Sequence, residues 1–487
     1  MTVFLPQNLD LATLVYDNEP TFKPFNRDKL RYIVHLITTR SQFKKDLLCE
    51  DYVPLSSKLL QKKIQNYKQY LDYLIDNLKI VESDRHYVVG VKSKGFRLVE
   101  SYRKSTVKPV QIEYLILRRV LKRERKRIDS SVAYHGHITK WFNKDKLKID
   151  VPLVHHFLEE ELKLKLGNPE LWDTDRKTNK KKKPWNQYNH AYVSAERLNC
   201  GDYHLLMDTN VGRFHSNLTN MRSVVRNAVT YDGQSLVSID IKNSQPYLST
   251  ALFRKQFWLG ENHSDKTVLK KSFSRTENDP FSIINDNITI NNIKVTETDS
   301  YIMLGENQLN LENKDFRKYT DLVVKGRLYE FLEAQFGATL GMEYCDRQDV
   351  KAAVFQVLFT NNRFIGQKEA APKKMFQTFF PDVYEVFAKI KSKDSTLLPR
   401  LLQSMESYLI IDVIAKRISE EYPEAPIFTI HDSISTTDEY LAPVSKIMNE
   451  ELTRAMGHPP ILQVEHWDKQ KIYDNLKKLE QRTRIVA

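Results

Sequence analysis

The stretch Ile427–Thr437 constrains the fold more than any other part of the chain. It reads Ile-Phe-Thr-Ile-His-Asp-Ser-Ile-Ser-Thr-Thr, two β-branched runs joined by a polar His431-Asp432-Ser433 step. β-branched residues favour strands, and a short polar step between two such runs is typical of a hairpin. We therefore predict two short strands with a carboxylate at their junction, on a rigid support. The same pattern also fits an ordinary hairpin with a solvated Asp at its tip.

A second acid ends another β-like run, Ser235–Asp240, which reads Ser-Leu-Val-Ser-Ile-Asp. An apolar helix is predicted shortly afterwards, over Leu248–Phe253. A carboxylate at the end of a strand and just before a helix is expected at the lip of a sheet. Each acid alone is a weak signal, because short motifs often occur by chance.

Two cations and two aromatic rings recur every fourth residue as Arg347, Lys351, Phe355 and Phe359. On an α-helix, residues four apart lie along one slowly drifting stripe. The cations of such a stripe can hold a polyphosphate, and the rings can stack on a base and pack beside a sugar. The alternative is a surface helix whose Phe side chains face the core while Arg and Lys extend to solvent.

Together, two strand-end acids and a helix of this kind are the parts needed for two-metal phosphoryl transfer. Two Mg²⁺ ions about 3.5–4 Å apart would hold the attacking 3′-hydroxyl and the leaving pyrophosphate oxygen. Mg²⁺ prefers carboxylate oxygens and keeps its other coordination positions for phosphate and water, so two acids suffice. Asp240 and Asp432 are therefore the predicted metal ligands.

The order and content of these motifs resemble the polymerase A superfamily, which holds the polymerase I-like DNA polymerases and the single-subunit phage-type RNA polymerases. The matching residues are Asp240 for the first palm aspartate, His431 and Asp432 for the second aspartate and its preceding His, and Arg347, Lys351 and Phe355 for the Arg-x-x-x-Lys-x-x-x-Phe fingers helix. Phe359 stands where that pattern has Tyr. Weaker matches are Gly212–Ser216 with Asn220, Phe379–Val383, and Gln403 ahead of a helix expected over 405–418. The resemblance covers Asp208–Trp467, about half of the chain.

The resemblance implies a role for each matching residue. Asp240 and Asp432 would bind the metals; Arg347 and Lys351 would hold the triphosphate, with Lys351 as proton donor to pyrophosphate; Phe355, Phe359 and Gln245 would contact the nucleotide; and Arg213, Gln403 and His431 would steady the primer-template. The implied reaction extends a nucleic-acid 3′ end and releases pyrophosphate.

The sequence leaves the product sugar open. In the DNA enzymes a Glu shortly after the first aspartate excludes the ribose 2′-hydroxyl, whereas here the Asp240-x-x-x-Ser244 spacing and Ser433 resemble the RNA enzymes. Phe355 and the Gly-Arg and Phe-Phe-Pro segments resemble the DNA enzymes. On these segments we favour DNA as the product. We expect loose sugar discrimination, because Phe359 lacks a hydroxyl that could sense the sugar.

The chain departs from the family pattern in three places. An enlarged segment separates Phe253 from Arg347 and is expected to contain a surface insertion at 255–315. Thr360-Asn361-Asn362 replaces the usual Gly after the fingers helix, which puts the hinge of that helix in doubt. No upstream set of acids suggests a proofreading exonuclease.

Residues 28–99 predict a small helix-rich unit that ends in a hairpin. Ser56 is positioned to cap a helix over 58–77, and strands are expected at 86–91 and 95–99. The apolar stripe of that helix is Leu59, Leu60, Ile64, Tyr67, Leu71 and Leu74, and its exposed cations are Lys58, Lys62, Lys63 and Lys68. The pattern resembles a winged-helix DNA-binding module with phosphate-contacting lysines. A helical packing domain with a solvated basic face fits equally well.

Composition bounds the protein class. The chain has 487 residues and a net charge of +13, so we expect about three domains and a polyanionic partner. Cys49, Cys200 and Cys345 are scattered, which predicts reduced thiols in a cytosolic setting. By analogy with small replication enzymes of phages and mobile elements, a bacterial or infected-cell cytoplasm is expected. No apolar run approaches the ~20 residues of a membrane helix, so no membrane contact is expected. The basic run 176–183 is predicted to be a solvated boundary loop, and the alternatives are a contact with a nucleic-acid backbone or a nuclear address.

The predicted architecture is α+β and multidomain, a right-hand polymerase body preceded by a winged-helix-like unit. Its expected parts are 1–100 (DNA-binding module), 101–200 (basic helical connector or thumb-like region) and 201–487 (antiparallel palm sheet with helical fingers over 320–395). We expect a monomer.

The leading functional hypothesis is a Mg²⁺-dependent, DNA-templated nucleotidyltransferase that uses nucleoside triphosphates, with DNA as the favoured product. The alternatives are a single-subunit RNA polymerase and a primase-like or terminal-transferase enzyme. The alternative from another class is a non-catalytic replication initiator or regulator, but a degenerate site would be expected to lack Asp240, Asp432 or Lys351.

Overall fold

The computed structural model describes residues 1–43, 52–84, 88, 93–129, 132–175, 180–254, 257, 287–290, 293–296, 313–340, 347–363, 365–367 and 370–486. Except for Val88, the strand predicted at 86–91 lies outside the described residues. So does most of the insertion expected at 255–315, of which the strands β11 (Asn287–Ile290) and β12 (Ile293–Thr296) are described as one antiparallel pair.

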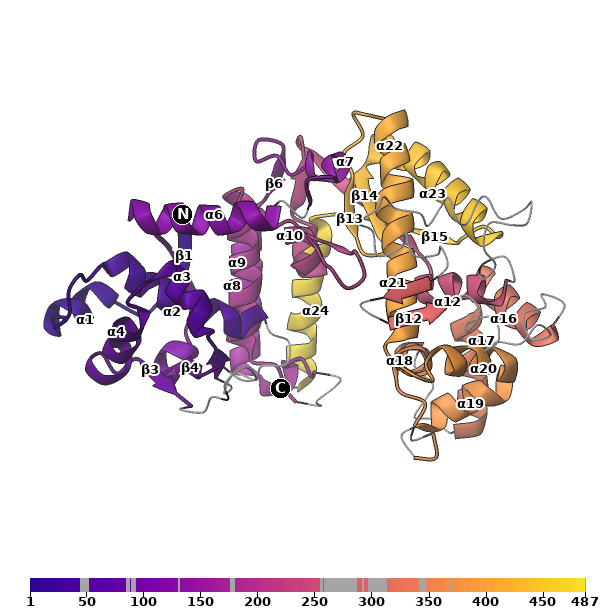
Figure 1. The fold of residues 1–487 in the computed structure, drawn as a ribbon, viewed down its shortest axis with the longest axis horizontal. Helices are drawn as coiled ribbons and strands as arrows, with labels where there is room; N and C mark the ends of the chain where they lie inside the picture. The colour runs from indigo at the N-terminus through magenta and orange to yellow at the C-terminus, as the bar shows by residue number, and fades with distance from the viewer. Residues whose placement is uncertain are drawn as a thin grey trace.

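The N-terminal part of the chain folds around its own hydrophobic core (Figure 1). Its helices are α1 (Leu11–Asp17), α2 (Arg27–Phe43), α3 (Ser57–Lys63), α4 (Tyr67–Asp72), the π-helix η1 (Tyr73–Asn77), α5 (Glu100–Arg103) and α6 (Leu115–Asp129). Its strands are β1 (Thr2–Pro6), β2 (Val53–Pro54), β3 (Val81–Ser83), β4 (Gly95–Leu98) and β5 (Val107–Gln111). β2, β4 and β3 form a three-stranded antiparallel sheet, and β1 pairs with β5.

The helix predicted over 58–77 is interrupted, so its continuity was predicted wrongly. Ser56 caps α3 as expected, its hydroxyl accepting the N–H of Leu59 at 3.4 Å. The chain then leaves the helix at Ile64, which is extended (φ −137°, ψ 100°) and fully buried, and it re-enters a helix at Tyr67. The predicted apolar stripe is buried except for Leu59, which is 42% exposed.

One lysine of this region also differs from the prediction. Lys58 and Lys62 are exposed, but Lys63 is half-buried and its ammonium donates to the Tyr32 hydroxyl at 3.0 Å. The exposed cations that a polyanion could contact on α3 are therefore Lys58 and Lys62.

The rest of the chain builds one larger body. Its helices up to residue 254 are α7 (Gly136–Thr139), α8 (Val151–Gly167), η3 (Pro169–Leu171), α9 (Pro184–Asn199), α10 (Asn217–Asn220), α11 (Ser223–Arg226), α12 (Ser244–Ser249) and η4 (Thr250–Phe253). From residue 313 onward come α16 (Lys314–Val324), α17 (Leu328–Leu340), α18 (Arg347–Phe359), α19 (Ala371–Phe379), α20 (Pro381–Ile390), α21 (Leu397–Ser407), the π-helix η7 (Tyr408–Ile414), α22 (Ala415–Glu421), η8 (Asp438–Tyr440), α23 (Leu441–Met456) and α24 (Gln470–Val486). Its strands are β6 (Leu147–Ile149), β7 (Leu206–Met207), β8 (Phe214–His215), β9 (Val229–Tyr231), β10 (Gln234–Ile241), β13 (Phe428–Ile430), β14 (Ser433–Thr437) and β15 (Leu462–His466).

The main sheet of this body is antiparallel and is centred on β10. Its strands follow the order β13-β14-β10-β9-β6, and β15 also pairs with β10. Because side chains alternate along a strand, Ile239 and Ile241 turn into the core, while Ser238 and Asp240 share the other face. The strand predicted over Ser235–Asp240 is thus present, with Asp240 one residue before its end.

Helices lie on both sides of this sheet (Figure 1). α21, η7 and α22 follow one another as a long rod, and α16 to α20 gather at its lower end. α8, α9 and α24 stand between the sheet and the N-terminal unit. The region 320–395 is helical throughout most of its described residues, as the sequence predicts.

The hydrophobic cores do not follow the boundaries expected at residues 100 and 200. The first core extends from Val3 to Leu121, because β5 pairs with β1 and α6 packs against the same residues. The second core begins at Val132 and includes α8 and α9. Residues 132–198 are therefore part of the larger body and do not form a separate connector.

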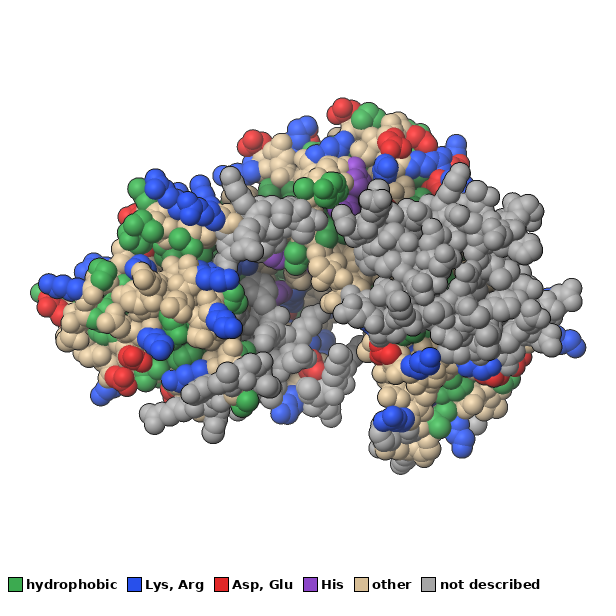
Figure 2. Space-filling model, in the orientation of Figure 1, with side chains coloured by type: hydrophobic (Ala, Val, Ile, Leu, Met, Phe, Trp, Pro, Cys, Tyr) green, Lys and Arg blue, Asp and Glu red, His purple; other side chains and the backbone are tan. Residues whose placement is uncertain are grey.

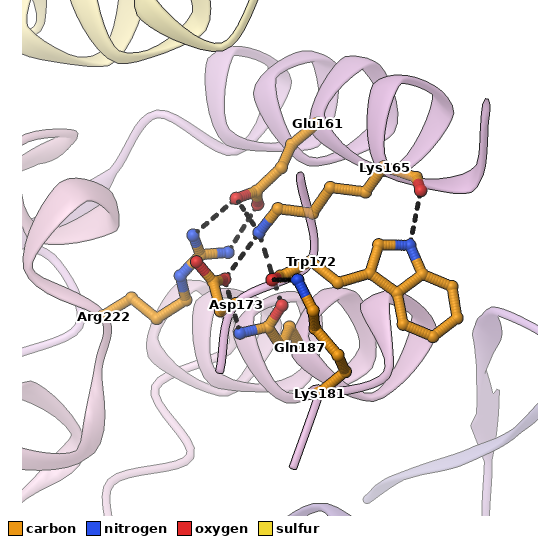
Figure 3. A network of polar contacts seen from close by, with 7 residues as sticks. All are labelled: Glu161, Lys165, Trp172, Asp173, Lys181, Gln187 and Arg222. Carbon is orange, nitrogen blue, oxygen red and sulfur yellow. Dashed lines mark hydrogen bonds and ion pairs between the residues drawn. The ribbon is translucent and has the colours of Figure 1, made fainter. Parts of the chain in front are cut away.

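A buried ionic network fixes the start of α11 against α8 (Figure 3). Glu161, 6% exposed, accepts both terminal N–H groups of Arg222 at 2.6 and 2.9 Å. Lys165, 2% exposed, donates to Glu161 at 3.0 Å and to Asp173 at 2.7 Å, and Gln187 donates to Asp173 at 2.9 Å. Every buried charge in this group thus has an opposite charge or a hydrogen-bond partner.

Of the helices in the described part of the chain, none is long and apolar enough to cross a membrane.

Candidate active site

The two predicted acids lie at the same end of the sheet. The antiparallel register pairs Asp240 of β10 with Ser433 of β14, so Asp432 is the next residue beyond that pair. β13 and β14 form the predicted hairpin, and His431 turns the chain between them with φ 56°. Asp240 and Asp432, which are 192 residues apart in the sequence (432 − 240), are thereby brought together by strand pairing.

Burial and the neighbouring charges shift the pKa of Asp240. Burial raises the pKa of this carboxyl well above its usual range, repulsion by Asp432 raises it further, and Lys351 opposes both effects. Glu406 and Glu465 add smaller repulsions. Lys351 of α18 therefore faces the acids, so three of the predicted site residues come together.

The acids fit a divalent cation. Within the described ranges, no group of three or more His, Cys, Asp and Glu side chains is arranged to hold a metal ion. Asp240 and Asp432 are nevertheless half-buried oxygen donors that repel each other. A hard cation between them would relieve that repulsion, and water and phosphate oxygens would supply its remaining ligands.

The stripe predicted for α18 is present and begins at Arg347. The rings of Phe355 and Phe359 stack with centroids 5.2 Å apart at 16°, and the Lys351 ammonium lies 5.8 Å from the centre of the Phe355 ring. Both rings are half-buried, and the cations at the start of the helix are exposed. The helix thus presents its charged end toward the acids while its rings remain partly accessible.

Two buried lysines hold the C-terminal end of α18, which Thr360-Asn361-Asn362 follow. Lys391, 3% exposed, donates to the carbonyls of Val357 and Thr360. Lys373, 2% exposed, donates to the Thr360 hydroxyl and to the Asn361 carbonyl at 2.8 Å. Carbonyls at a helix end lack intrahelical donors and carry partial negative charge, so both ammonium groups are well placed. Burial and the neighbouring Lys373 lower the pKa of Lys391 to about 7.

A third carboxylate connects two predicted residues beside the acids. Glu406 of α21 is 2% exposed and accepts hydrogen bonds from Arg213 and from the Gln245 amide. Burial raises the pKa of Glu406 to about 7, Arg213 opposes that rise, and Asp432 adds to it. Glu406 is thus close enough to Asp432 to sense its charge, and it brings Arg213 and Gln245 to the same place.

A chain of polar groups leads from the hairpin turn toward Asp208. The rings of His431 and His215 lie 6.3 Å apart, edge to face, and His215 Nε2 is 3.5 Å from an Asp208 oxygen. Burial opposes ionisation of Asp208, but His215 and the N–H groups of Val211, Asn210 and Arg213 outweigh it and lower its pKa to about 2. His431 is exposed beside Asp432, where it can meet a ligand.

Four predicted residues lie away from the acids or differ from their predicted placement. Lys58, Lys62 and Lys63 belong to α3 of the N-terminal unit, on the other side of α8 and α9 from α18 (Figure 1). Gln403 was expected ahead of a helix over 405–418, but it lies inside α21, one turn before Glu406. It is half-buried there.

Several residues near the acids were missed by sequence reasoning. Arg226 of α11 is partly buried and attracted by Asp240 and Glu465, and burial lowers its pKa. Tyr329 of α17 is buried; burial raises its pKa to about 12, the nearby Arg347 opposes this rise and Asp432 adds to it. No local sequence pattern marks Arg226, Tyr329 or Glu406, because elements distant in the sequence bring them near the acids.

No family model matches the chain, and no curated protein matches it. Among solved structures, it is similar to the POL domain of Pol1 from M. smegmatis in complex with DNA primer-template and dNTP. The two sequences are 13% identical, the match covers 73% of this chain and 74% of that chain, and the TM-score is 0.31.

Proposed function

We propose that this chain is a template-directed nucleotidyltransferase that extends a nucleic-acid 3′ end. The observation that supports this most is the convergence of Asp240, Asp432 and Lys351, from two paired strands and one helix, at one end of an antiparallel sheet. The sequence resemblance to the polymerase A superfamily runs through the same residues.

The reaction proposed is a phosphoryl transfer. The 3′-hydroxyl gives its proton to water while its oxygen bonds to the α-phosphorus of a nucleoside triphosphate, the bond from that phosphorus to the bridging oxygen breaks, and pyrophosphate leaves. Two Mg²⁺ ions held by Asp240 and Asp432 would activate the hydroxyl and neutralise charge on the leaving group. The chain itself contributes a fixed pair of carboxylates and a cationic helix end.

The other residues bind and orient the substrates. Arg347 and Lys351, exposed at the start of α18, would hold the triphosphate, and Lys351 would give a proton to the departing pyrophosphate. Phe355 and Phe359 would pack on the nucleotide through their accessible faces. Gln245, whose amide donates to Glu406, would contact the nucleotide beside that carboxylate.

The primer-template would be steadied by Arg213, Gln403 and His431. Arg213 is engaged with Glu406 through Nε and Nη2, which leaves Nη1 as the donor for a phosphate oxygen. Arginine is well suited to a phosphate contact of this kind. The exposed Lys58 and Lys62 of α3 would add sequence-independent contacts to the DNA backbone.

DNA is the favoured product, and an RNA product is the second candidate. Ser433 supports the second candidate because it follows the second aspartate, where the DNA enzymes that the chain resembles usually have a further Glu and the RNA enzymes do not. Ser433 is paired with Asp240 across the sheet. Its hydroxyl donates to the Ile430 carbonyl at 3.0 Å, so it belongs to the hairpin turn.

An incorporation assay tests the proposal. The full chain is given a primed DNA template with Mg²⁺ and either the four dNTPs or the four NTPs, and parallel reactions omit the template or the primer. Template-dependent extension supports the proposal, and the nucleotide set that extends faster identifies the product. Absence of extension with both sets, or extension that ignores the template, contradicts it.

A further inference from the structure

We propose that Lys242 is an additional phosphate-binding residue and that the Glu330 carboxylate occupies its site until a polyphosphate displaces it. This inference rests on the nucleotidyltransferase proposed above and adds to it the third cation that would hold the triphosphate. It concerns residues from the β10–α12 loop, α17 and α18.

One carboxylate oxygen lies between two cations from separate elements. Oε1 of Glu330, in the first turn of α17, is 3.8 Å from Nη2 of Arg347 and 4.0 Å from Nζ of Lys242. Arg347 begins α18, and Lys242 follows Asp240 by two residues. The same oxygen therefore marks a place where an anion feels both charges.

The contacts of Glu330 are loose. Both distances exceed that of a direct hydrogen bond, and the side chain of Glu330 is 48% exposed. Exposed ion pairs of this kind contribute little to stability. A triphosphate offers several charged oxygens, and each could accept a direct N–H bond from Arg347 or Lys242. Displacing Glu330 by such a ligand would therefore cost little and gain several hydrogen bonds.

The backbone of Lys242 is hydrogen-bonded and its side chain is largely buried. Its backbone N–H donates to the Ile461 carbonyl at 2.9 Å, and its side chain is only 20% exposed. The side chain passes Gly326, which has φ 63°. A Cβ on Gly326 would lie 3.0 Å from the Lys242 ammonium nitrogen and 2.8 Å from Ile461 Cδ1. The turn between α16 and α17 thus leaves room for Lys242 to reach Glu330.

Arg347 is oriented from the other side. Its guanidinium lies 6.0 Å from the centre of the buried Tyr329 ring, a distance that allows a cation–π attraction. Tyr329 directly precedes Glu330 on α17, so one helix turn supplies both the ring and the carboxylate. Lys242 and Arg347 are therefore two cations from two different elements that face one anion position on α17.

The test measures binding of inorganic tripolyphosphate by calorimetry on the full chain, without divalent cations. Lys242→Met and Arg347→Met should each weaken binding about tenfold, because each removes a charged donor. Glu330→Gln should tighten binding about threefold, because it removes a competing charge. Lys242→Arg should restore most of the affinity. Lys325→Met is the matched control, since Lys325 is an exposed lysine paired with Asp321 of α16, and it should change nothing.

Three outcomes would overturn the inference: no binding by the unaltered chain, unchanged binding by Lys242→Met, or weaker binding by Glu330→Gln. Melting temperatures of all variants must match the parent for a comparison, and the opposite signs expected for Lys242→Met and Glu330→Gln exclude a common loss of folding. If this binding pattern holds but no nucleotide is incorporated, the proposed function fails and the phosphate site stands. If incorporation occurs and nucleotide KM is unchanged by Lys242→Met, the site fails and the function stands.

Discussion

Arg213 donates from both Nε and Nη2 to one oxygen of Glu406, although the two residues are 193 positions apart in the sequence. The other oxygen of Glu406 accepts from Gln245. A buried carboxylate thus fixes two side chains that we assign to the primer-template and to the nucleotide. Glu406 is also close enough to Asp432 for their charges to repel, so this arrangement lies near the two acids.

Glu406→Gln should weaken the binding of primer-template about tenfold, because a charge-assisted hydrogen bond to Arg213 is replaced by a neutral one. Fluorescence anisotropy with a labelled primer-template measures the dissociation constant. Asp394→Asn is the control, because Asp394 forms a comparable pair with Arg400 ahead of the same helix, at 2.6 Å. Equal effects of the two variants would show that Glu406 has only a structural role.

Lys165→Met should lower the free energy of unfolding by about 3 kcal/mol, because it removes one member of a buried ionic network and leaves Glu161 and Asp173 with fewer donors. Denaturant titration measures the change. Lys163→Met, on the same helix and paired with Glu160 at the surface, should leave the unfolding free energy unchanged. A similar loss in both variants would contradict the account of the network in Figure 3.

Lys391 should make the stability of the chain depend on pH. Burial, with Lys373 beside it, lowers its pKa from 10.5 to about 7 in the folded chain. Between these values the unfolded chain binds a proton that the folded chain does not, so this group makes the folded state more stable as the pH rises. The gain is at most about 1.4 kcal/mol per pH unit. Below pH 7 both states are protonated and the dependence disappears.

Lys391→Met should flatten this dependence. The unfolding free energy of the unaltered chain, minus that of the variant, should increase from pH 7 to pH 9 in denaturant titrations. Lys389, which pairs with Glu385 one turn before it, provides the control variant Lys389→Met. Parallel curves for the parent and Lys391→Met would show that Lys391 keeps its proton throughout.

The double variant Lys58→Ala/Lys62→Ala should weaken binding to duplex DNA at every sequence and reduce its salt dependence. Removing a lysine that neutralises one phosphate makes the slope of log K against log salt shallower by about 0.9. Lys104→Ala, an exposed lysine next to α5 that pairs with Glu100, serves as the control. Figure 2 also shows Lys and Arg side chains over α6, so residual binding by the double variant would be expected. An unchanged salt slope would remove α3 from the DNA-binding surface.

Local sequence patterns were sufficient to predict the elements that carry the acids. β-branched runs predicted β10 and the β13–β14 hairpin, and a four-residue spacing predicted α18 from Arg347 to Phe359. These predictions succeeded because strand alternation and helical spacing are properties of neighbouring residues.

Features that depend on distant residues could not be predicted in this way. The apolar stripe from Leu60 to Leu74 continues without a gap, yet the helix breaks at Ile64, where tertiary packing buries an extended residue. Lys63 gave no sign of its contact with Tyr32. Glu406 and Lys391 look like surface residues in the sequence, and only the fold shows that Arg213 and the end of α18 surround them.

The most direct test of the central claim is the rate of nucleotide incorporation by Asp240→Asn and Asp432→Asn on a primed template with Mg²⁺. Asp438→Asn is the matched control, because Asp438 follows the same strand β14 and its side chain is 76% exposed. Loss of a metal ligand removes several kcal/mol of transition-state stabilisation, which corresponds to about a thousandfold in rate. We predict this loss in both site variants, with unchanged melting temperature, and full activity in Asp438→Asn. Full activity in either Asp240→Asn or Asp432→Asn would contradict a shared metal site at these two carboxylates.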